Sequence, residues 1–134
     1  MAYEHHLRVR YGETDQMGVV HHANYLLYME EARTTFLRER GCSYADLERS
    51  GIGLPVRSCE LRYRASALYE DELVVRIQVA KMGAASLTFG YEIERKADSA
   101  RLVSGQVELA CVDLASNPRK PRMLPKELRS LFED

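Results

Sequence analysis

The chain has 134 residues, of which 46% are hydrophobic, and its 19 basic and 20 acidic residues leave a net charge of −1 at pH 7. This length suits one globular unit, and we expect residues 1–134 to form a single domain. The near-neutral charge excludes the strong basic field of a nucleic-acid-binding protein. No apolar run approaches the ~20 residues of a membrane span, and the first residues lack the apolar core of a secretion signal, so we predict a cytoplasmic location.

Two elements are expected in the first third of the chain. Alternation of apolar and polar residues predicts a strand from His6 to Tyr11, with Tyr11 on its apolar side. A long helix is expected over residues 24–40, with Asn24 as its N-cap and Gly41 as its stop. Its apolar residues recur every three to four positions, which is typical of an amphipathic helix. They are Tyr25, Leu26, Met29, Ala32, Phe36 and Leu37.

The rest of the chain is predicted to be mainly strand. Four runs alternate with a period of two. They cover residues 58–65, 75–79, 87–94 and 102–114. Short connections at 82–85 and 96–99 predict that the last three runs form an antiparallel meander. The final run changes phase near Val112, which indicates a bulge.

Two short helices complete the expected elements, one over residues 43–50 and one from about Pro125. The three cysteines are widely spaced, which fits reduced thiols and excludes a metal or redox motif built on closely spaced cysteines. Cys59 and Cys111 fall on the apolar sides of their predicted strands. We expect both to fill the core.

The expected elements define one architecture. A long amphipathic helix and several strands with one apolar face each bury those faces only if the sheet curls around the helix. The predicted fold is therefore α+β, a curved antiparallel sheet of about five strands wrapped around one long central helix. Such a sheet leaves an open edge, which a second copy protects by continuing the sheet. We expect a homodimer or a homotetramer.

The turn between the first strand and the long helix carries the candidate chemistry. It holds Asp15, Gly18 and His22 beside the start of the helix. Backbone amides and the helix dipole at such a place favour an anion, so the turn suits an anionic intermediate. The adjacent His21 and His22 make a poor pair of ligands for one metal ion, and no other ligand spacing is present. No metal or cofactor is expected.

This turn and the helix behind it resemble the hotdog-fold acyl-CoA thioesterases. The shared motif is Y-x-x-T-D-x-x-G-V-V-x-H-A-x-Y at residues 11–25 with E-x-A-R at residues 30–33. Within that family the motif is similar to the 4-hydroxybenzoyl-CoA thioesterase type and to the Tol-Pal-cluster thioesterases. The resemblance implies that Asp15 attacks the thioester carbonyl or activates a water, and that the amide of His22 polarises the carbonyl oxygen. The imidazole of His22 is implied as a second catalytic group.

The resemblance also implies where an acyl-CoA substrate binds. Contacts are expected from the turn, from the first helical turns and from a basic loop near the chain end that holds coenzyme A phosphates in the resembling enzymes. These candidate substrate-binding residues are Gly18, Val19, Tyr25, Met29, Arg119, Lys120 and Arg122. A basic side chain of a partner subunit can equally hold the phosphates. Glu30 and Arg33 are expected either as a surface pair or as a buried pair at a subunit interface.

Three functions remain open on the sequence alone. The first is a thioesterase that hydrolyses short-to-medium aliphatic or aromatic acyl-CoA, with acyl carrier protein as an alternative carrier of the acyl group. The second is a hotdog-fold dehydratase or hydratase acting on acyl thioesters. The third is a module that binds acyl-CoA or acyl carrier protein without turnover.

Overall fold

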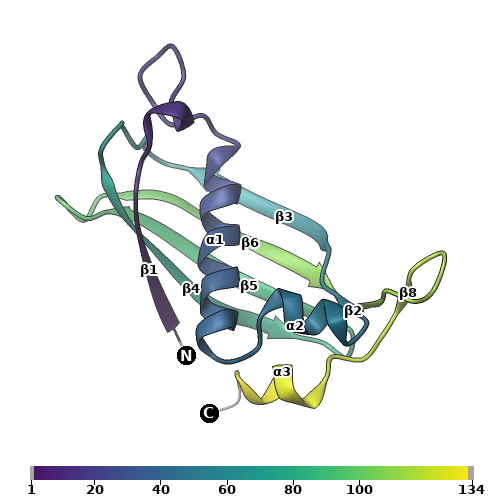
Figure 1. The fold of residues 1–134 in the computed structure, drawn as a ribbon. Helices are drawn as coiled ribbons and strands as arrows, with labels where there is room; N and C mark the ends of the chain where they lie inside the picture. The colour runs from purple at the N-terminus through teal and green to yellow at the C-terminus, as the bar shows by residue number, and fades with distance from the viewer. Residues whose placement is uncertain (1, 133–134) are drawn as a thin grey trace.

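One long helix lies against one face of a five-stranded antiparallel sheet, as Figure 1 shows for the computed structural model, which describes residues 2–132. The strand order in the sheet is β1-β4-β5-β6-β3. The strands are β1 (Ala2–Arg8), β3 (Val56–Tyr63), β4 (Glu72–Met82), β5 (Ser86–Arg95) and β6 (Arg101–Ala110), and the helix is α1 (Asn24–Glu39). The predicted α+β architecture, with the first strand joined to a β4-β5-β6 meander, is confirmed.

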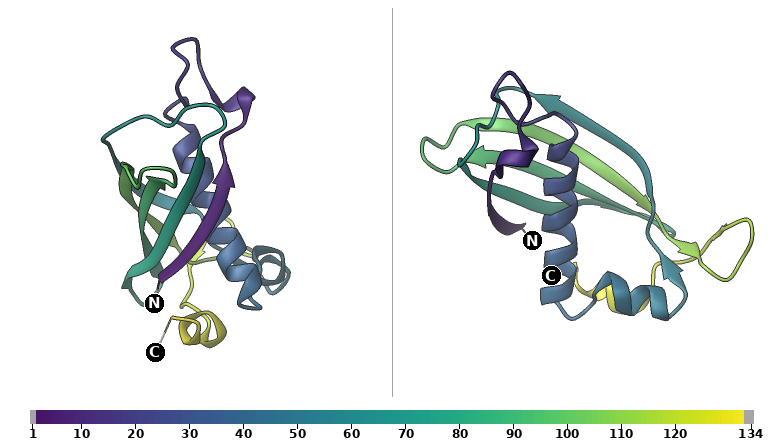
Figure 2. Two further views of the ribbon diagram at one scale, coloured as in Figure 1. Left: turned by 90° about the vertical axis from the view of Figure 1, so that its left-hand side faces the viewer. Right: turned by 45° about the horizontal axis from the view of Figure 1, so that its top comes forward.

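Smaller elements gather at one end of the molecule. A second, three-stranded sheet has the order β2-β7-β8. It comprises β2 (Ile52–Gly53), β7 (Val112–Asp113) and β8 (Lys120–Pro121), and it lies near α2 (Tyr44–Arg49) and α3 (Lys126–Ser130). The turn that leads into α1 lies at the opposite end of that helix, and both views in Figure 2 agree on this. The molecule therefore has a turn end and a small-sheet end.

The core forms between the inner face of the sheet and one face of α1. Met29, Ala32 and Leu37 of the helix are fully buried. They pack with the inward-facing apolar side chains of the three central strands, such as Ile77 and Phe89. Burial of apolar surface stabilises a fold by about 25 cal/mol for each Å². Any shift of α1 along the sheet would expose part of this surface, so the packing fixes the position of the helix on the sheet.

Two expectations for the long helix change. Asn24 is the first residue of the helix and not its N-cap, a place that Ala23 occupies without a side-chain cap. Leu26 is 36% exposed, whereas Tyr28 is only 3% exposed and faces the core. Tyr28 is buried at low cost because its hydroxyl donates to the carboxylate of Glu13. The predicted stop is confirmed, since Gly41 has a φ of 82° just after the helix.

Arg33 does not pair with Glu30 within the chain. The Arg33 side chain is 4% exposed and donates to the hydroxyls of Tyr44 at 2.8 Å and Tyr91 at 3.0 Å. Glu30 is exposed. The surface-pair prediction is therefore wrong, because the guanidinium turns into the core and donates to two tyrosine hydroxyls instead of a carboxylate.

Three strand predictions also change. The first strand ends at Arg8, and Tyr11 is 74% exposed because the chain turns there through η1 (Tyr11–Glu13). Cys59 is exposed, whereas Cys111 is buried as expected. Cys59 lies on β3, an edge strand that the helix does not cover.

The phase change near Val112 has a different cause from the expected bulge. β6 ends at Ala110, and Val112 belongs to β7 of the small sheet. The chain therefore passes from one sheet to another. Among residues 2–132, no helix is long and apolar enough to cross a membrane.

Candidate active site

The turn that carries Asp15 is a tight reversal of the chain. The Asp15 amide donates to the Val19 carbonyl at 2.9 Å, and the Gly18 amide donates to the Asp15 carbonyl at 2.9 Å. Gly18 has a φ of 81°, which side chains other than glycine adopt with strain. The Oδ1 atom of Asp15 accepts from the Met17 amide at 2.9 Å. Its other carboxylate oxygen has no partner among the residues that the structure describes, so it is available for chemistry.

The turn is fastened to the loop between β3 and β4. Val19 forms an isolated antiparallel bridge with Leu68. The Val20 amide donates to the Ala67 carbonyl at 2.9 Å, and the Ala67 amide donates to the Tyr25 hydroxyl at 3.0 Å. Segments about fifty residues apart in sequence thus meet around Asp15.

The start of α1 presents a free amide. The His21 carbonyl accepts from the Asn24 amide at 2.9 Å, and the His21 amide donates to the Glu13 carbonyl at 2.9 Å. In contrast, the His22 amide has no acceptor within residues 2–132. Free amides at a helix start carry the positive end of the helix dipole, so this amide suits a developing oxyanion.

The two histidines of the turn have different surroundings. Their rings are 4.3 Å apart, and Nδ1 of His21 accepts from the Ala23 amide at 3.3 Å. The His22 ring stands edge-on to Tyr63, whose hydroxyl donates to the His22 carbonyl at 3.3 Å. The His21 ring therefore serves as a local hydrogen-bond acceptor for the main chain, whereas His22 lines the pocket described next.

A pocket of about 300 Å³ brings these groups together. Four predicted site residues line it, namely Asp15, Val19, His22 and Tyr25. The sequence missed the opposite wall, because nothing in its spacing links the end of β3 to the turn. That wall comprises Tyr63, Arg64, Ala65 and Ser66. This volume is at the low end for small-ligand sites and suits an acyl group rather than a whole coenzyme A.

Two other predicted pocket residues do not line this space. Met29 is fully buried in the core, where the helix packs on the sheet. Gly18 shapes the turn between two residues that do line the pocket, Met17 and Val19. A larger hollow of about 590 Å³ lies on the sheet beside Arg76, Glu92 and Gln106. It contains none of the turn residues, so we assign the chemistry to the smaller pocket.

The predicted basic residues lie at the small-sheet end. Lys120 belongs to β8, and Arg119 and Arg122 flank that strand. Arg119 donates to the Leu114 carbonyl, and Arg122 donates to the Gly51 carbonyl at 3.4 Å. Figure 1 shows β8 far from the turn, at the other end of α1, and none of these three residues lines the pocket of its own chain.

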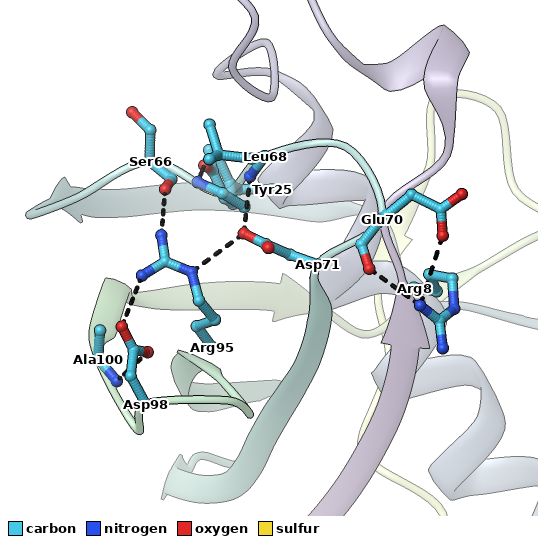
Figure 3. A network of polar contacts seen from close by, with 10 residues as sticks. Arg8, Tyr25, Ser66, Leu68, Glu70, Asp71, Arg95, Asp98 and Ala100 are labelled. Carbon is cyan, nitrogen blue, oxygen red and sulfur yellow. Dashed lines mark hydrogen bonds and ion pairs between the residues drawn. The ribbon is translucent and has the colours of Figure 1, made fainter.

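Arg95 holds the pocket wall to the sheet, as Figure 3 shows. Its guanidinium donates to the Ser66 carbonyl at 2.8 Å and forms ion pairs with Asp71 and Asp98, each at 3.0 Å. The same Asp71 oxygen accepts from the Leu68 amide at 2.8 Å. Charge-assisted bonds of this kind are about twice as strong as neutral ones, so Arg95 fixes the segment that receives the turn.

The buried tyrosines near the turn keep their protons. Burial raises the pKa of Tyr25, and the bond from the Ala67 amide opposes this effect only in part. Burial and the hydrogen bond to Glu13 raise the pKa of Tyr28 well above its usual range. Neither hydroxyl therefore supplies an anion at neutral pH.

Comparison of this sequence with known proteins identifies the family to which it belongs. The profile of the thioesterase-like superfamily matches residues 9–132. The acyl-CoA thioester hydrolase YbgC of Escherichia coli O6:H1 is 35% identical over 127 residues, which cover 95% of this chain and 92% of that protein. The acyl-CoA thioesterase YbgC of Haemophilus influenzae is 34% identical over 127 residues, which cover 94% and 90%. The chain belongs to the thioesterase-like superfamily.

Solved structures agree with this membership. The crystal structure of the DHNA-CoA thioesterase from Staphylococcus aureus has a TM-score of 0.87 and 31% identity, and the match covers 97% of this chain and 85% of that one. The predictions of a hotdog fold and of a thioester-hydrolysing enzyme are thereby confirmed. Within residues 2–132, no three side chains of His, Cys, Asp or Glu are placed to hold a metal ion.

Removing the guanidinium of Arg95 should loosen the pocket wall of this thioesterase. In Arg95→Gln we expect the amides of Val20, Ala67 and Leu68 to exchange hydrogen for deuterium about tenfold faster, because local opening becomes easier by roughly 1.4 kcal/mol. Arg101→Gln is the control, since Arg101 is exposed and has no ion pair in the described part of the chain. Equal exchange in the native protein and Arg95→Gln would contradict this role.

Proposed function

We propose that this protein hydrolyses acyl-CoA thioesters to a free acid and coenzyme A. One observation carries the proposal: Asp15 and His22 line one pocket, and a carboxylate oxygen of Asp15 and the amide and imidazole of His22 have no hydrogen-bond partner among the described residues. Hydrolysis of a thioester needs an attacking group, a stabiliser for the oxyanion and a proton for the leaving thiolate. The names of the relatives, acyl-CoA thioester hydrolase and acyl-CoA thioesterase, support this substrate class.

Asp15 starts the reaction in either of two ways. As a general base it takes a proton from a water that attacks the thioester carbonyl. As a nucleophile it attacks the carbonyl itself, forms a mixed anhydride and releases the thiolate, after which water hydrolyses the anhydride. Both routes use the carboxylate oxygen that the Met17 amide leaves free.

The main chain stabilises the oxyanion in both routes. The carbonyl oxygen gains negative charge when it is attacked, and the His22 amide is the donor placed at the helix start. Removal of one such donor in comparable sites costs roughly 2.7–4 kcal/mol of barrier. The His22 imidazole then protonates the leaving thiolate or holds the attacking water.

The acyl group is proposed to enter the pocket beside Val19 and Tyr25. The small volume favours short-to-medium aliphatic or aromatic acyl groups. The nucleotide of coenzyme A stays outside it, where Arg119, Lys120 and Arg122 of a second subunit are the proposed phosphate contacts. Acyl carrier protein remains an alternative carrier. The three cysteines are free, which fits the reducing cytoplasm predicted from the sequence.

A dimer is part of the proposal. β3 is an edge strand whose residues are exposed except for the half-buried Leu61. Val56 and Tyr63, at its two ends, are 52% and 49% exposed, although both are large and apolar. An open edge of this kind invites a further strand, and a second β3 supplies one with a closed symmetry.

The two alternative functions, an acyl-binding module and a dehydratase or hydratase, explain fewer features of the pocket than thioester hydrolysis does. A module that only binds acyl groups needs neither a free carboxylate oxygen nor a free amide across the pocket. A dehydratase or hydratase uses a histidine and a carboxylate to move protons on the acyl chain, and it needs no attacking group at the thioester carbonyl. The arrangement of Asp15 and the His22 amide favours hydrolysis.

Replacing the carboxylate tests the function directly. Asp15→Asn keeps the shape of the side chain but removes its charge, so we expect kcat/KM to fall about 10³-fold or more, the equivalent of ~4 kcal/mol. Free-thiol release from a panel of acyl-CoA esters, short aliphatic to aromatic, measures this for both proteins. No turnover by the native protein, or equal turnover by Asp15→Asn, would contradict the proposal.

The two adjacent histidines of the turn provide a test variant and its control. We expect His22→Ala to lower kcat about 10²-fold, the usual size of a general-acid contribution, because the pocket loses its proton donor. His21→Ala should lose less than about fivefold, since its ring faces the local chain. Steady-state kinetics with the preferred ester compares them. A larger loss in His21→Ala would reverse the assignment.

The oligomeric state tests the role of β3. Light scattering should give twice the mass of one chain for the native protein. Cys59→Lys places like charges at the proposed contact and should raise the dissociation constant at least tenfold. His6→Lys changes an exposed residue on the opposite edge strand, β1, and should leave the dimer intact. If His6→Lys dissociates the dimer and Cys59→Lys does not, β1 is the interface.

A further inference from the structure

Asn24 connects the two halves of the candidate site. Its side-chain Nδ2 donates to the Glu13 carbonyl at 2.8 Å, and its main-chain amide donates to the His21 carbonyl at 2.9 Å. The Glu13 carbonyl also accepts from the His21 amide at 2.9 Å. One half-buried residue thus contacts the segment before Asp15 and the peptide before His22.

These contacts fix the direction of the free amide. The His21 carbonyl and the His22 amide belong to one planar peptide unit, so a bond to the carbonyl also orients the N–H at its other end. Glu13 lies two residues before Asp15, and its carbonyl accepts from the Asn24 side chain and from the His21 amide, which belongs to the neighbouring peptide unit. The distance between carboxylate and oxyanion donor therefore depends on Asn24.

A second side chain of α1, that of Tyr28, also forms a hydrogen bond with Glu13. The Tyr28 hydroxyl donates to Oε1 of Glu13 at 2.8 Å, and the Arg10 amide donates to that oxygen at 2.8 Å. Asn24 and Tyr28 are four residues apart and so lie on one face of the helix. Tyr28 holds the Glu13 side chain, whereas Asn24 holds its main chain, which runs on into the turn.

We propose that Asn24 is a positioning residue of the thioesterase site, which sets the geometry between the Asp15 carboxylate and the His22 amide. The proposal rests on the proposed function for its catalytic consequence. A shift of about 1 Å between reacting groups can cost 10²-fold in rate, while the binding of the acyl group in the pocket is unaffected. The expected signature is a loss in kcat with little change in KM.

Asn24→Asp isolates this effect. It keeps the shape of the side chain but replaces the NH₂ donor by a carboxylate oxygen that faces the Glu13 carbonyl. A carboxylate at a helix start interacts favourably with the dipole, so the helix should keep its stability. We expect kcat to fall about 10- to 100-fold, KM to change less than twofold and the melting temperature to stay within about 2 °C.

Two comparisons separate positioning from folding. Asn24→Ser retains a short donor and should lose less kcat than Asn24→Ala at similar stability. Thr34→Ala removes an exposed hydroxyl bond further along α1 and should leave kcat unchanged. An unchanged kcat in Asn24→Asp, or a kcat that falls only with the folded fraction, would overturn the proposal.

Amide exchange gives a readout that needs no substrate. In Asn24→Asp the hydrogen-bonded amides of residues 21 and 24 should exchange about tenfold faster than in the native protein, while those of the core strands do not change. Unchanged exchange at both amides would overturn the role of Asn24 even if no thioester is cleaved. If exchange changes as expected but the native protein cleaves no thioester, the proposed function fails and the structural role of Asn24 stands.

Discussion

The burial of one face of α1 against the sheet is the constraint on which the rest of the molecule depends. Met29, Ala32 and Leu37 are fully buried, so the helix has little freedom to slide or rotate. Its first turn then lies at one end of the sheet, directly after the His22 amide, which has no acceptor among the described residues. The positive end of the helix dipole therefore has a fixed position, because the packing of α1 on the sheet determines where the helix begins.

Loops from two parts of the chain close around that point. The turn before α1 brings the carboxylate, and the loop after β3 brings the opposite wall, held by Arg95 and Asp71. Each loop is fastened by hydrogen bonds to main-chain atoms, such as the bond from the Val20 amide to the Ala67 carbonyl. The site is therefore built by loops but positioned by the helix and the sheet.

The sequence predicted the parts of this arrangement that depend on local pattern. Period-two and helical periodicity gave the meander and the long helix, and the glycine after Arg40 marked its end. The motif of the turn gave Asp15, Val19, His22 and Tyr25, which meet in one pocket. These residues lie within eleven positions of one another, so their spacing alone places them together.

Contacts between distant segments were not predictable in the same way. Apolar alternation placed Cys59 in the core, because the pattern does not reveal that β3 is an edge strand. Arg33 suggested a pair with Glu30, because no local signal points to the hydroxyls of Tyr44 and Tyr91. The pocket wall after β3 was missed for the same reason. Each of these errors concerns a partner that only the tertiary structure supplies.

The wall and the exposed edge strand are continuous, and this links catalysis to assembly. Tyr63 ends β3 and lines the pocket, and Arg64, Ala65 and Ser66 follow it directly. A second copy paired along β3 would therefore stand beside the pocket mouth, where one chain leaves the site open. The basic loop at the small-sheet end does not reach the pocket of its own chain. Its proposed contact with coenzyme A thus requires the second copy, and the same pairing would cover the exposed edge.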